Sequence, residues 1–292
     1  MANKIEIIFA DVYGFCPGIQ RTVEIYEKSL KKYKKPIFSF GQIGHNPHLV
    51  KKFSDLGIVE IHKLSDISPN ISKKKINLII SPHGAPKKIY KEAEKLNINL
   101  IDATCPLVKK IIDLGLKYQK KDYQIILYGK KNHQEILSIL TFLNQAILID
   151  KKENISSQIK NLSKKRKTVL LSQTTKNKKD FQSIATEIKK YFTNLIVENT
   201  ICDASFIRQN GVRKLAKKTK LIIIIGGKNS SNSKELVNVG IESGAKTYLV
   251  EKISDLKKEW FINQKKLGIS AGASTPKESI AEITTWIKEN IK

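Results

Sequence analysis

The sequence LIIIIGGKNSSNS at residues 221–233 decides the fold class of this chain. Residues 221–225 are a continuous run of leucine and isoleucine, which is typical of a parallel strand buried on both faces. The glycines and small polar residues after this run are typical of a tight loop that opens a helix. The stretch therefore indicates a strand, a loop and a helix in succession, the repeating unit of parallel α/β proteins.

The same alternation continues along the chain. Short apolar runs have the length of strands, and the lysine-rich stretches between them have helical spacing. This pattern predicts βαβ units with mostly parallel sheets, which is an α/β fold. Residues 154–167 are the most polar and irregular stretch and predict a loop or a short helix. Strand-like runs lie at residues 5–9, 76–80, 124–128, 168–171, 194–197 and 247–250, and helical stretches include residues 87–96, 107–120, 181–192 and 280–291.

Three cysteines, Cys16, Cys105 and Cys202, each lie in a small-residue loop that opens a helix, and they are spaced about ninety residues apart. One cysteine in each third of the chain suggests three similar units that meet at a shared centre. We therefore place the three α/β units at residues 1–104, 105–200 and 201–292, with the N-terminal strand able to pack with the third unit. An odd number of cysteines argues against a disulfide framework, and reduced thiols are typical of a cytosolic protein.

Three thiolates that converge on one point would bind a metal centre and leave one coordination position open. The chain has none of the closely spaced cysteine pairs that structural zinc sites prefer, so an iron–sulfur cluster fits better than zinc. A zinc site of three cysteines and a histidine stays open as an alternative. Three unrelated core cysteines are a second alternative, because free cysteine is among the most buried residue types.

Polar loops follow most of the predicted strands, and ligands of parallel α/β proteins gather at the carboxyl ends of the strands. The loop at residues 226–233 is the clearest anion site, because glycines, hydroxyls and helix N–H groups can surround phosphate oxygens. Residues 270–275 are a second contributor. Ordinary strand-to-helix turns are the alternative for both loops.

Three of the five histidines, His45, His83 and His133, lie in these strand-end loops, and His45 and His83 could donate hydrogen bonds to a diphosphate. Glu135 follows His133 by two residues, and in a partly dry pocket it could hold a proton at neutral pH and act as a general acid. The alternative is a solvated helix start, where the helix dipole favours an acidic residue.

The net charge of +26, from 53 basic and 27 acidic residues, would attract nucleic acid or small anions. The lysines are scattered and are not interleaved with stacking aromatics, so we interpret the charge mainly as composition and do not expect a nucleic-acid partner. No apolar run is long enough to span a membrane, and the N-terminus lacks the pattern of a signal or transit peptide. We therefore expect a cytoplasmic protein with no membrane partner.

The motifs, taken together and in order, resemble the family of 4-hydroxy-3-methylbut-2-enyl diphosphate reductases, the last enzymes of the methylerythritol phosphate route to isoprenoids. The resemblance runs over nearly the whole chain. It is carried by Gly14-Phe15-Cys16-Pro17-Gly18, His45-Asn46, His83-Gly84, Asp102-Ala103-Thr104-Cys105-Pro106-Leu107-Val108, His133-Gln134-Glu135, Gln173-Thr174-Thr175, Cys202-Asp203-Ala204, Lys228-Asn229-Ser230-Ser231-Asn232-Ser233 and Gly272-Ala273-Ser274.

The resemblance implies three α/β units in a trefoil-like, pseudo-threefold arrangement around a central [4Fe–4S] cluster. It implies that Cys16, Cys105 and Cys202 hold this cluster with one iron site open, and that Glu135 supplies protons with help from Thr174 and His133. Ferredoxin or flavodoxin would deliver electrons one at a time, and the products would be isopentenyl and dimethylallyl diphosphate. The implied substrate-binding residues are His45, His83, His133, Thr174, Ser230, Ser231, Asn232 and Ser274.

Departures from the family pattern are small: Pro17 stands where alanine is more usual, Pro82 precedes His83, and residues 205–207 replace a more polar run. None of them removes an implied ligand or proton donor. Two rival functions remain at this point. One is an iron–sulfur hydratase or dehydratase, which needs no external electrons. The other is a non-catalytic protein that binds anions or nucleic acid and keeps its cysteines in the core.

Overall fold

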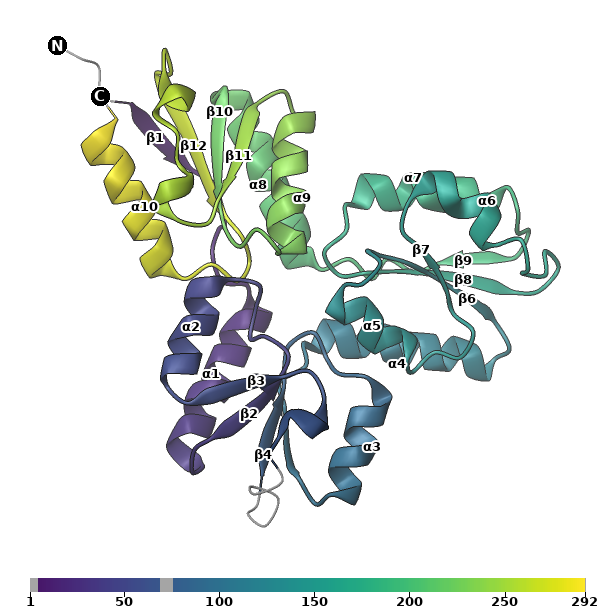
Figure 1. Ribbon diagram of the computed structural model, residues 1–292. Helices are drawn as coiled ribbons and strands as arrows, with labels where there is room; N and C mark the ends of the chain where they lie inside the picture. The colour runs from purple at the N-terminus through teal and green to yellow at the C-terminus, as the bar shows by residue number, and fades with distance from the viewer. Residues whose placement is uncertain (1–4, 69–75, 292) are drawn as a thin grey trace. The chain divides into compact units, whose positions relative to one another are not determined.

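The computed structural model describes residues 5–68 and 76–291 and has the expected α/β architecture (Figure 1). Its strands form three four-stranded sheets, and every strand pair is parallel. The sheet orders are β3-β2-β4-β5, β7-β6-β8-β9 and β1-β12-β10-β11. The strands are β1 (Glu6–Phe9), β2 (Ile37–Phe40), β3 (Ile58–Ile61), β4 (Asn77–Ile80), β5 (Asn99–Asp102), β6 (Gln124–Tyr128), β7 (Ile147–Ile149), β8 (Thr168–Ser172), β9 (Leu195–Val197), β10 (Leu221–Ile225), β11 (Lys246–Val250) and β12 (Lys266–Ala271).

The three sheets share one topology, which confirms the prediction of three similar α/β units. In each sheet an inner strand, β2, β6 or β10, has the next strand along the chain beside it at one edge, and the strand after that on its other side. The fourth position is taken by β5, by β9 and, in the last sheet, by the N-terminal strand β1, which pairs with β12. The helices are α1 (Pro17–Lys32), α2 (Pro47–Asp55), α3 (Lys87–Lys95), α4 (Pro106–Lys120), α5 (Gln134–Leu140), α6 (Ile155–Gln158), α7 (Lys178–Lys189), α8 (Asp203–Lys218), α9 (Ser231–Glu242) and α10 (Lys277–Asn290).

The chain divides into two compact units. The terminal unit comprises Met1–Gln20, Gly44–Asp55 and Asp203–Lys292 and contains the sheet of β1, β12, β10 and β11. The central unit comprises Arg21–Ile43 and Leu56–Cys202 and contains the other two sheets. The boundaries near residues 104 and 200, and the placing of three units around one centre, stay predictions from the sequence.

The core of the terminal unit explains why the run at residues 221–225 has no polar member. Ile223 packs on the cluster that includes Ile283 of α10, whereas Ile222 and Ile224 pack on the cluster that includes Val212 of α8 and residues of α9. The three isoleucines are fully buried. Helices therefore cover both faces of β10, as expected for a central parallel strand.

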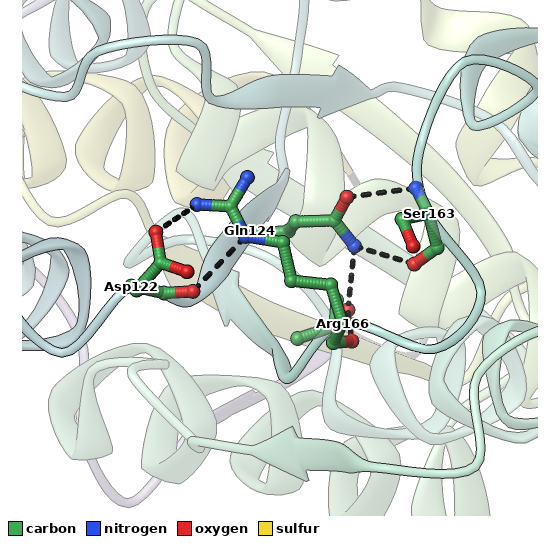
Figure 2. Close-up of polar contacts among 5 residues, drawn as sticks. Asp122, Gln124, Ser163 and Arg166 are labelled. Carbon is green, nitrogen blue, oxygen red and sulfur yellow. Dashed lines mark hydrogen bonds and ion pairs between the residues drawn. The ribbon is translucent and has the colours of Figure 1, made fainter.

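The irregular stretch at residues 154–167 contains the short helix α6, as the sequence predicted. The loop after α6 is tied to the start of β6, because Ser163 and the Gln124 side chain exchange two hydrogen bonds of 2.8 and 2.9 Å (Figure 2). Arg166 binds both the carbonyl and the carboxylate of Asp122 in the same view. These contacts add polar anchors to a segment whose Ile155 and Ile159 are also buried in the core with Ile126 of β6.

No helix in the described ranges is long and apolar enough to cross a membrane.

Candidate active site

Three loops of the terminal unit lie close together at the carboxyl ends of β10 and β12. A Cβ atom added at Gly227 would lie 1.8 Å from the backbone carbonyl oxygen of His45. A Cβ atom added at Gly44 would lie 2.8 Å from Cβ of Ser274. The His45 loop therefore packs directly on the loops that carry Ser230 and Ser274, and only glycine allows this close approach.

Buried polar atoms line this loop cluster. Ser230 is the N-cap of α9, and its Oγ accepts a hydrogen bond of 3.2 Å from the backbone N–H of Ser233. Asn232 Nδ2, Ser233 Oγ and Ser270 Oγ are buried without a hydrogen-bond partner. Buried polar groups are normally paired, so these atoms indicate a ligand with oxygen acceptors. A phosphate group at the start of α9 would satisfy them and would also benefit from the helix dipole.

The sequence predicted His45, Ser230, Ser231, Asn232 and Ser274 for this region, and the structure places all of them in the terminal unit. Ser231 and His45 are half-buried, and the others are buried. Ser233 and Ser270 lie in the two loops that the sequence predicted for anion binding, although neither was singled out as a contact, and Gly226 and Gly272 both approach Ser233 closely. A Cβ atom at either glycine would lie 2.3 or 2.2 Å from Ser233 Oγ.

We expect Gly227→Ala to displace the His45 loop and to destabilise the terminal unit, because the new methyl group would overlap a backbone atom. The matched control is Gly211→Ala in α8, where a Cβ atom would meet Ala10 Cβ at an ordinary 3.5 Å and where alanine favours the helix. Thermal unfolding should show a lower Tm for Gly227→Ala only. An equal Tm for the two variants would mean that the close approach is not needed.

A buried carboxyl group is the centre of the candidate site in the central unit. Glu135 lies in the first turn of α5 and is only 2% exposed, so the alternative of a solvated helix start is wrong. Its two carboxylate oxygens accept hydrogen bonds of 2.8 Å from the backbone N–H and the hydroxyl of Thr174. Burial raises the pKa of Glu135 to about 7, although the two bonds from Thr174 lower it. Glu135 can therefore hold or release a proton near neutral pH.

His133 is the residue that caps α5, and this role fixes its tautomer. Its Nδ1 accepts a hydrogen bond of 3.2 Å from the backbone N–H of Glu135, so the neutral ring carries its proton on Nε2. The ring of His83 meets the ring of His133 edge-to-face, with centroids 5.8 Å apart. The structure thus brings His83, His133, Glu135 and Thr174 together in one unit, and their roles stay predictions.

The cysteine loops are held by backbone hydrogen bonds. The N–H of Cys105 donates to Pro82 O at 2.9 Å, beside His83, and the N–H of Cys202 donates to Thr174 O at 2.8 Å. Both cysteines belong to the central unit. Two predicted cluster ligands are therefore joined through the backbone to residues of the predicted proton and diphosphate sites.

Cys16 belongs to the terminal unit and precedes α1. Its sulfur accepts an N–H···S contact of 3.4 Å from Ile19, the kind of hydrogen bond that tunes cluster thiolates. All three cysteines are half-buried and form no disulfide bond, which suits ligands better than core residues. In the described part of either unit taken alone, no three His, Cys, Asp or Glu side chains form a metal site. The three-cysteine site stays a prediction.

Parallel sheets, polar loops at the strand ends and a buried acid with a pKa near 7 are features typical of an α/β enzyme. The chain belongs to the LytB protein family, whose profile matches residues 7–288. It is 37% identical to the 4-hydroxy-3-methylbut-2-enyl diphosphate reductase of Nautilia profundicola, over 96% of this chain and 98% of that protein. It is 34% identical to the reductase of the same name from Aquifex aeolicus, over 98% and 96% of the two chains.

Solved structures give the same relationship. The structure of the E-1-hydroxy-2-methyl-but-2-enyl-4-diphosphate reductase from Plasmodium falciparum matches with a TM-score of 0.90 and 30% identity, covering 97% of this chain and 87% of that one. A structure of (E)-4-hydroxy-3-methyl-but-2-enyl diphosphate reductase, described as the terminal enzyme of the non-mevalonate pathway, matches with a TM-score of 0.69 and 34% identity over 98% and 99% of the chains.

Proposed function

We propose that this protein is an oxidoreductase that converts (E)-4-hydroxy-3-methylbut-2-enyl diphosphate into isopentenyl diphosphate and dimethylallyl diphosphate, the last step of the methylerythritol phosphate pathway. The observation that carries the proposal is the near full-length match to reductases of this name. The reaction consumes two electrons and two protons, replaces the allylic hydroxyl by hydrogen and releases water. One proton leaves with the hydroxyl oxygen, and the other adds to either end of the allyl unit.

Glu135 is the proton donor in this proposal. Hydroxide is a poor leaving group at neutral pH, so the reaction needs a proton at the departing oxygen. A carboxyl group with a pKa near 7 is protonated in a large fraction of molecules and can still release its proton. Thr174 holds both carboxylate oxygens and so fixes the direction in which the acid points. His133 contributes by capping the helix turn that carries Glu135.

The diphosphate contacts in this proposal are of two kinds. Buried hydroxyl and amide donors lie at the start of α9, and imidazole donors come from the strand-end loops. Because the diphosphate is remote from the bond that breaks, its binding energy serves to orient the carbon chain. The proposed contacts are His45, His83, His133, Thr174, Ser230, Ser231, Asn232 and Ser274.

Cys16, Cys105 and Cys202 are the proposed ligands of a [4Fe–4S] cluster with one open iron site. The proposal is supported by three half-buried cysteines in helix-opening loops, none in a disulfide bond, and by the N–H···S contact at Cys16. When bound, the cluster supplies single electrons and a Lewis-acidic iron. Ferredoxin or flavodoxin is the proposed electron donor, since both carry electrons one at a time.

Metal analysis and turnover together test this function. Anaerobically purified protein should contain about four irons and four sulfides per chain, and it should form both products only when a reductant is added. Turnover of substrate without reductant would instead indicate an iron–sulfur dehydratase. A colourless protein that lacks iron and binds RNA in a salt-sensitive manner would indicate the non-catalytic alternative.

We expect Thr174→Val to raise the pKa of Glu135 further, because the variant removes a hydroxyl that stabilises the carboxylate. The alkaline limb of the pH–rate profile should then move to higher pH, and turnover should fall by about tenfold as the acid loses its orienting bond. Thr174→Ser keeps the hydroxyl and is the matched control. An alkaline limb at the same pH in Thr174→Val and wild type would show that Thr174 does not influence the pKa of the proton donor.

A further inference from the structure

A buried arginine holds the loop in front of Cys16. Arg208 lies in α8, is 2% exposed, and its Nη2 donates hydrogen bonds of 2.8 and 2.9 Å to the backbone carbonyls of Gly14 and Phe15. These are the two residues that immediately precede Cys16. The Nη1 atom donates to Ala204 O of its own helix at 2.9 Å, which fixes the guanidinium plane against α8.

A second arginine makes the same contact in front of another cysteine. In the central unit, Arg21 Nη1 donates to the carbonyls of Ala103 and Thr104 at 3.4 and 3.2 Å. These two residues immediately precede Cys105. Arg21 is half-buried and its bonds are longer, so its hold on the loop is the weaker of the two.

In both places the arginine fixes one end of the peptide unit that leads into the cysteine, and a backbone carbonyl fixes the other end. The N–H of Cys16 donates to Ala273 O at 3.0 Å, while Arg208 binds the carbonyl of the same peptide unit. The N–H of Cys105 donates to Pro82 O at 2.9 Å, while Arg21 binds the carbonyl of that unit. Because a peptide unit is planar, fixing both ends sets the orientation of the peptide plane that leads into the cysteine and so restricts where its Cα can lie.

The scarcity of arginine in this chain supports a specific need for it at positions 21 and 208. The chain has only four arginines among its 53 basic residues, so lysine serves at nearly every other basic position. A planar guanidinium can bridge two carbonyls, whereas the ammonium of lysine is a point charge without a preset geometry. Arg166 also makes a two-point contact, with Asp122 (Figure 2). Arg213 donates to the Asn210 side chain at 2.9 Å.

The two arginines also occupy matching places in the chain. Arg208 lies in the second turn of the helix that follows Cys202, and Arg21 lies in the second turn of the helix that follows Cys16. Each helix thus starts after one cysteine and carries an arginine that holds the loop before a different cysteine. We propose that Arg208 and Arg21 are positioning residues that preset Cys16 and Cys105 for the cluster, an inference that rests on the proposed function.

Amide hydrogen exchange of the full chain tests the positioning directly. We would compare wild type with Arg208→Met, Arg208→Lys, Arg21→Met and Arg21→Lys, all made cluster-free by anaerobic chelation so that ligand binding does not contribute. Both Arg208 variants should speed exchange in residues 14–19 by about tenfold and leave residues 103–108 unchanged. Both Arg21 variants should speed exchange in residues 103–108 by a smaller factor and leave residues 14–19 unchanged.

Two controls separate local positioning from general destabilisation. Arg213→Met removes an arginine from α8 without touching a cysteine loop, and Arg166→Met removes the two-point contact of Figure 2. Neither should change exchange in residues 14–19 or 103–108. The rate of amide exchange in β10 should be the same in wild type and in all variants. Unchanged exchange at 14–19 in both Arg208 variants, or an equal increase throughout the chain, would overturn the proposal.

The cluster provides a second measurement. Iron per chain should fall in Arg208→Met and should be equally low in Arg208→Lys. The ammonium group of lysine keeps the charge but lacks the planar guanidinium that binds two carbonyls. In the molecules that keep iron, the spectrum of the reduced protein should differ from wild type for both substitutions. Full iron content and a wild-type spectrum in Arg208→Lys would overturn the proposal. Iron-free wild-type protein would refute the proposed function, and the exchange result would still decide what Arg208 does.

Discussion

Turnover of the Glu135→Gln variant should fall by about 10²-fold or more, because glutamine keeps the shape of the side chain but has no proton to release. Glutamine can still accept a hydrogen bond from Thr174, so the local structure should persist. Iron content and the visible spectrum should equal those of wild type. Steady-state kinetics with excess reductant, together with iron analysis of the same sample, measure both expectations.

The pH dependence of the wild type supplies the control for Glu135. The donor must be protonated, so turnover should fall as pH rises through about 7, the pKa of the buried carboxyl group. This limb should be absent in Glu135→Gln. Near-normal turnover in the variant, or an unchanged alkaline limb, would remove Glu135 from the proton-transfer step.

The same carboxyl group links stability to pH. Its folded-state pKa of about 7 lies above the ordinary value of 4.5, so between these values the folded protein binds more protons than the unfolded chain. The free energy of unfolding should therefore decrease as pH rises from 4.5 to about 7. Glu135→Gln should lose this part of the dependence, which chemical denaturation at several pH values would measure.

The central strands could be predicted from sequence because burial on both faces leaves a continuous apolar run, as in β10. The short strands β3, β5 and β7 left a weaker pattern. They lie at sheet edges and are partly exposed; Glu60 interrupts β3, Asn99 and Asp102 bound β5, and β7 has only three residues. Such strands depend on pairing with a neighbour that is distant in sequence, which a local pattern does not report.

Residue types at the strand ends predicted most residues of the candidate site, but they did not predict which of these residues are buried. The sequence placed Glu135 at a helix start and left open whether it was solvated. Its burial depends on the loop of Thr174, which lies well outside any local pattern. The arginine contacts were missed for the same reason. Arg208 and Gly14 are far apart in the chain, and only the fold brings them within 2.8 Å.

Replacement of any one of the three cysteines by serine should remove the cluster and the activity together. Serine is nearly isosteric with cysteine, so folding should persist, whereas an alcohol is a poor ligand for iron at neutral pH. The expectation is the same for Cys16→Ser, Cys105→Ser and Cys202→Ser, although the first residue lies in the terminal unit and the others lie in the central unit. Each variant serves as the comparison for the other two.

Unequal results would discriminate between the alternatives that the sequence left open. If the cysteines were unrelated core residues, each serine variant would change stability by its own amount and leave iron and turnover unaffected. If all three are ligands, each variant loses most of its iron and its turnover, while its Tm should stay close to that of wild-type protein from which the cluster has been removed. A single brown, iron-containing and active serine variant would exclude that cysteine from the ligand set. Iron analysis, a visible spectrum and thermal unfolding of the three variants decide the matter.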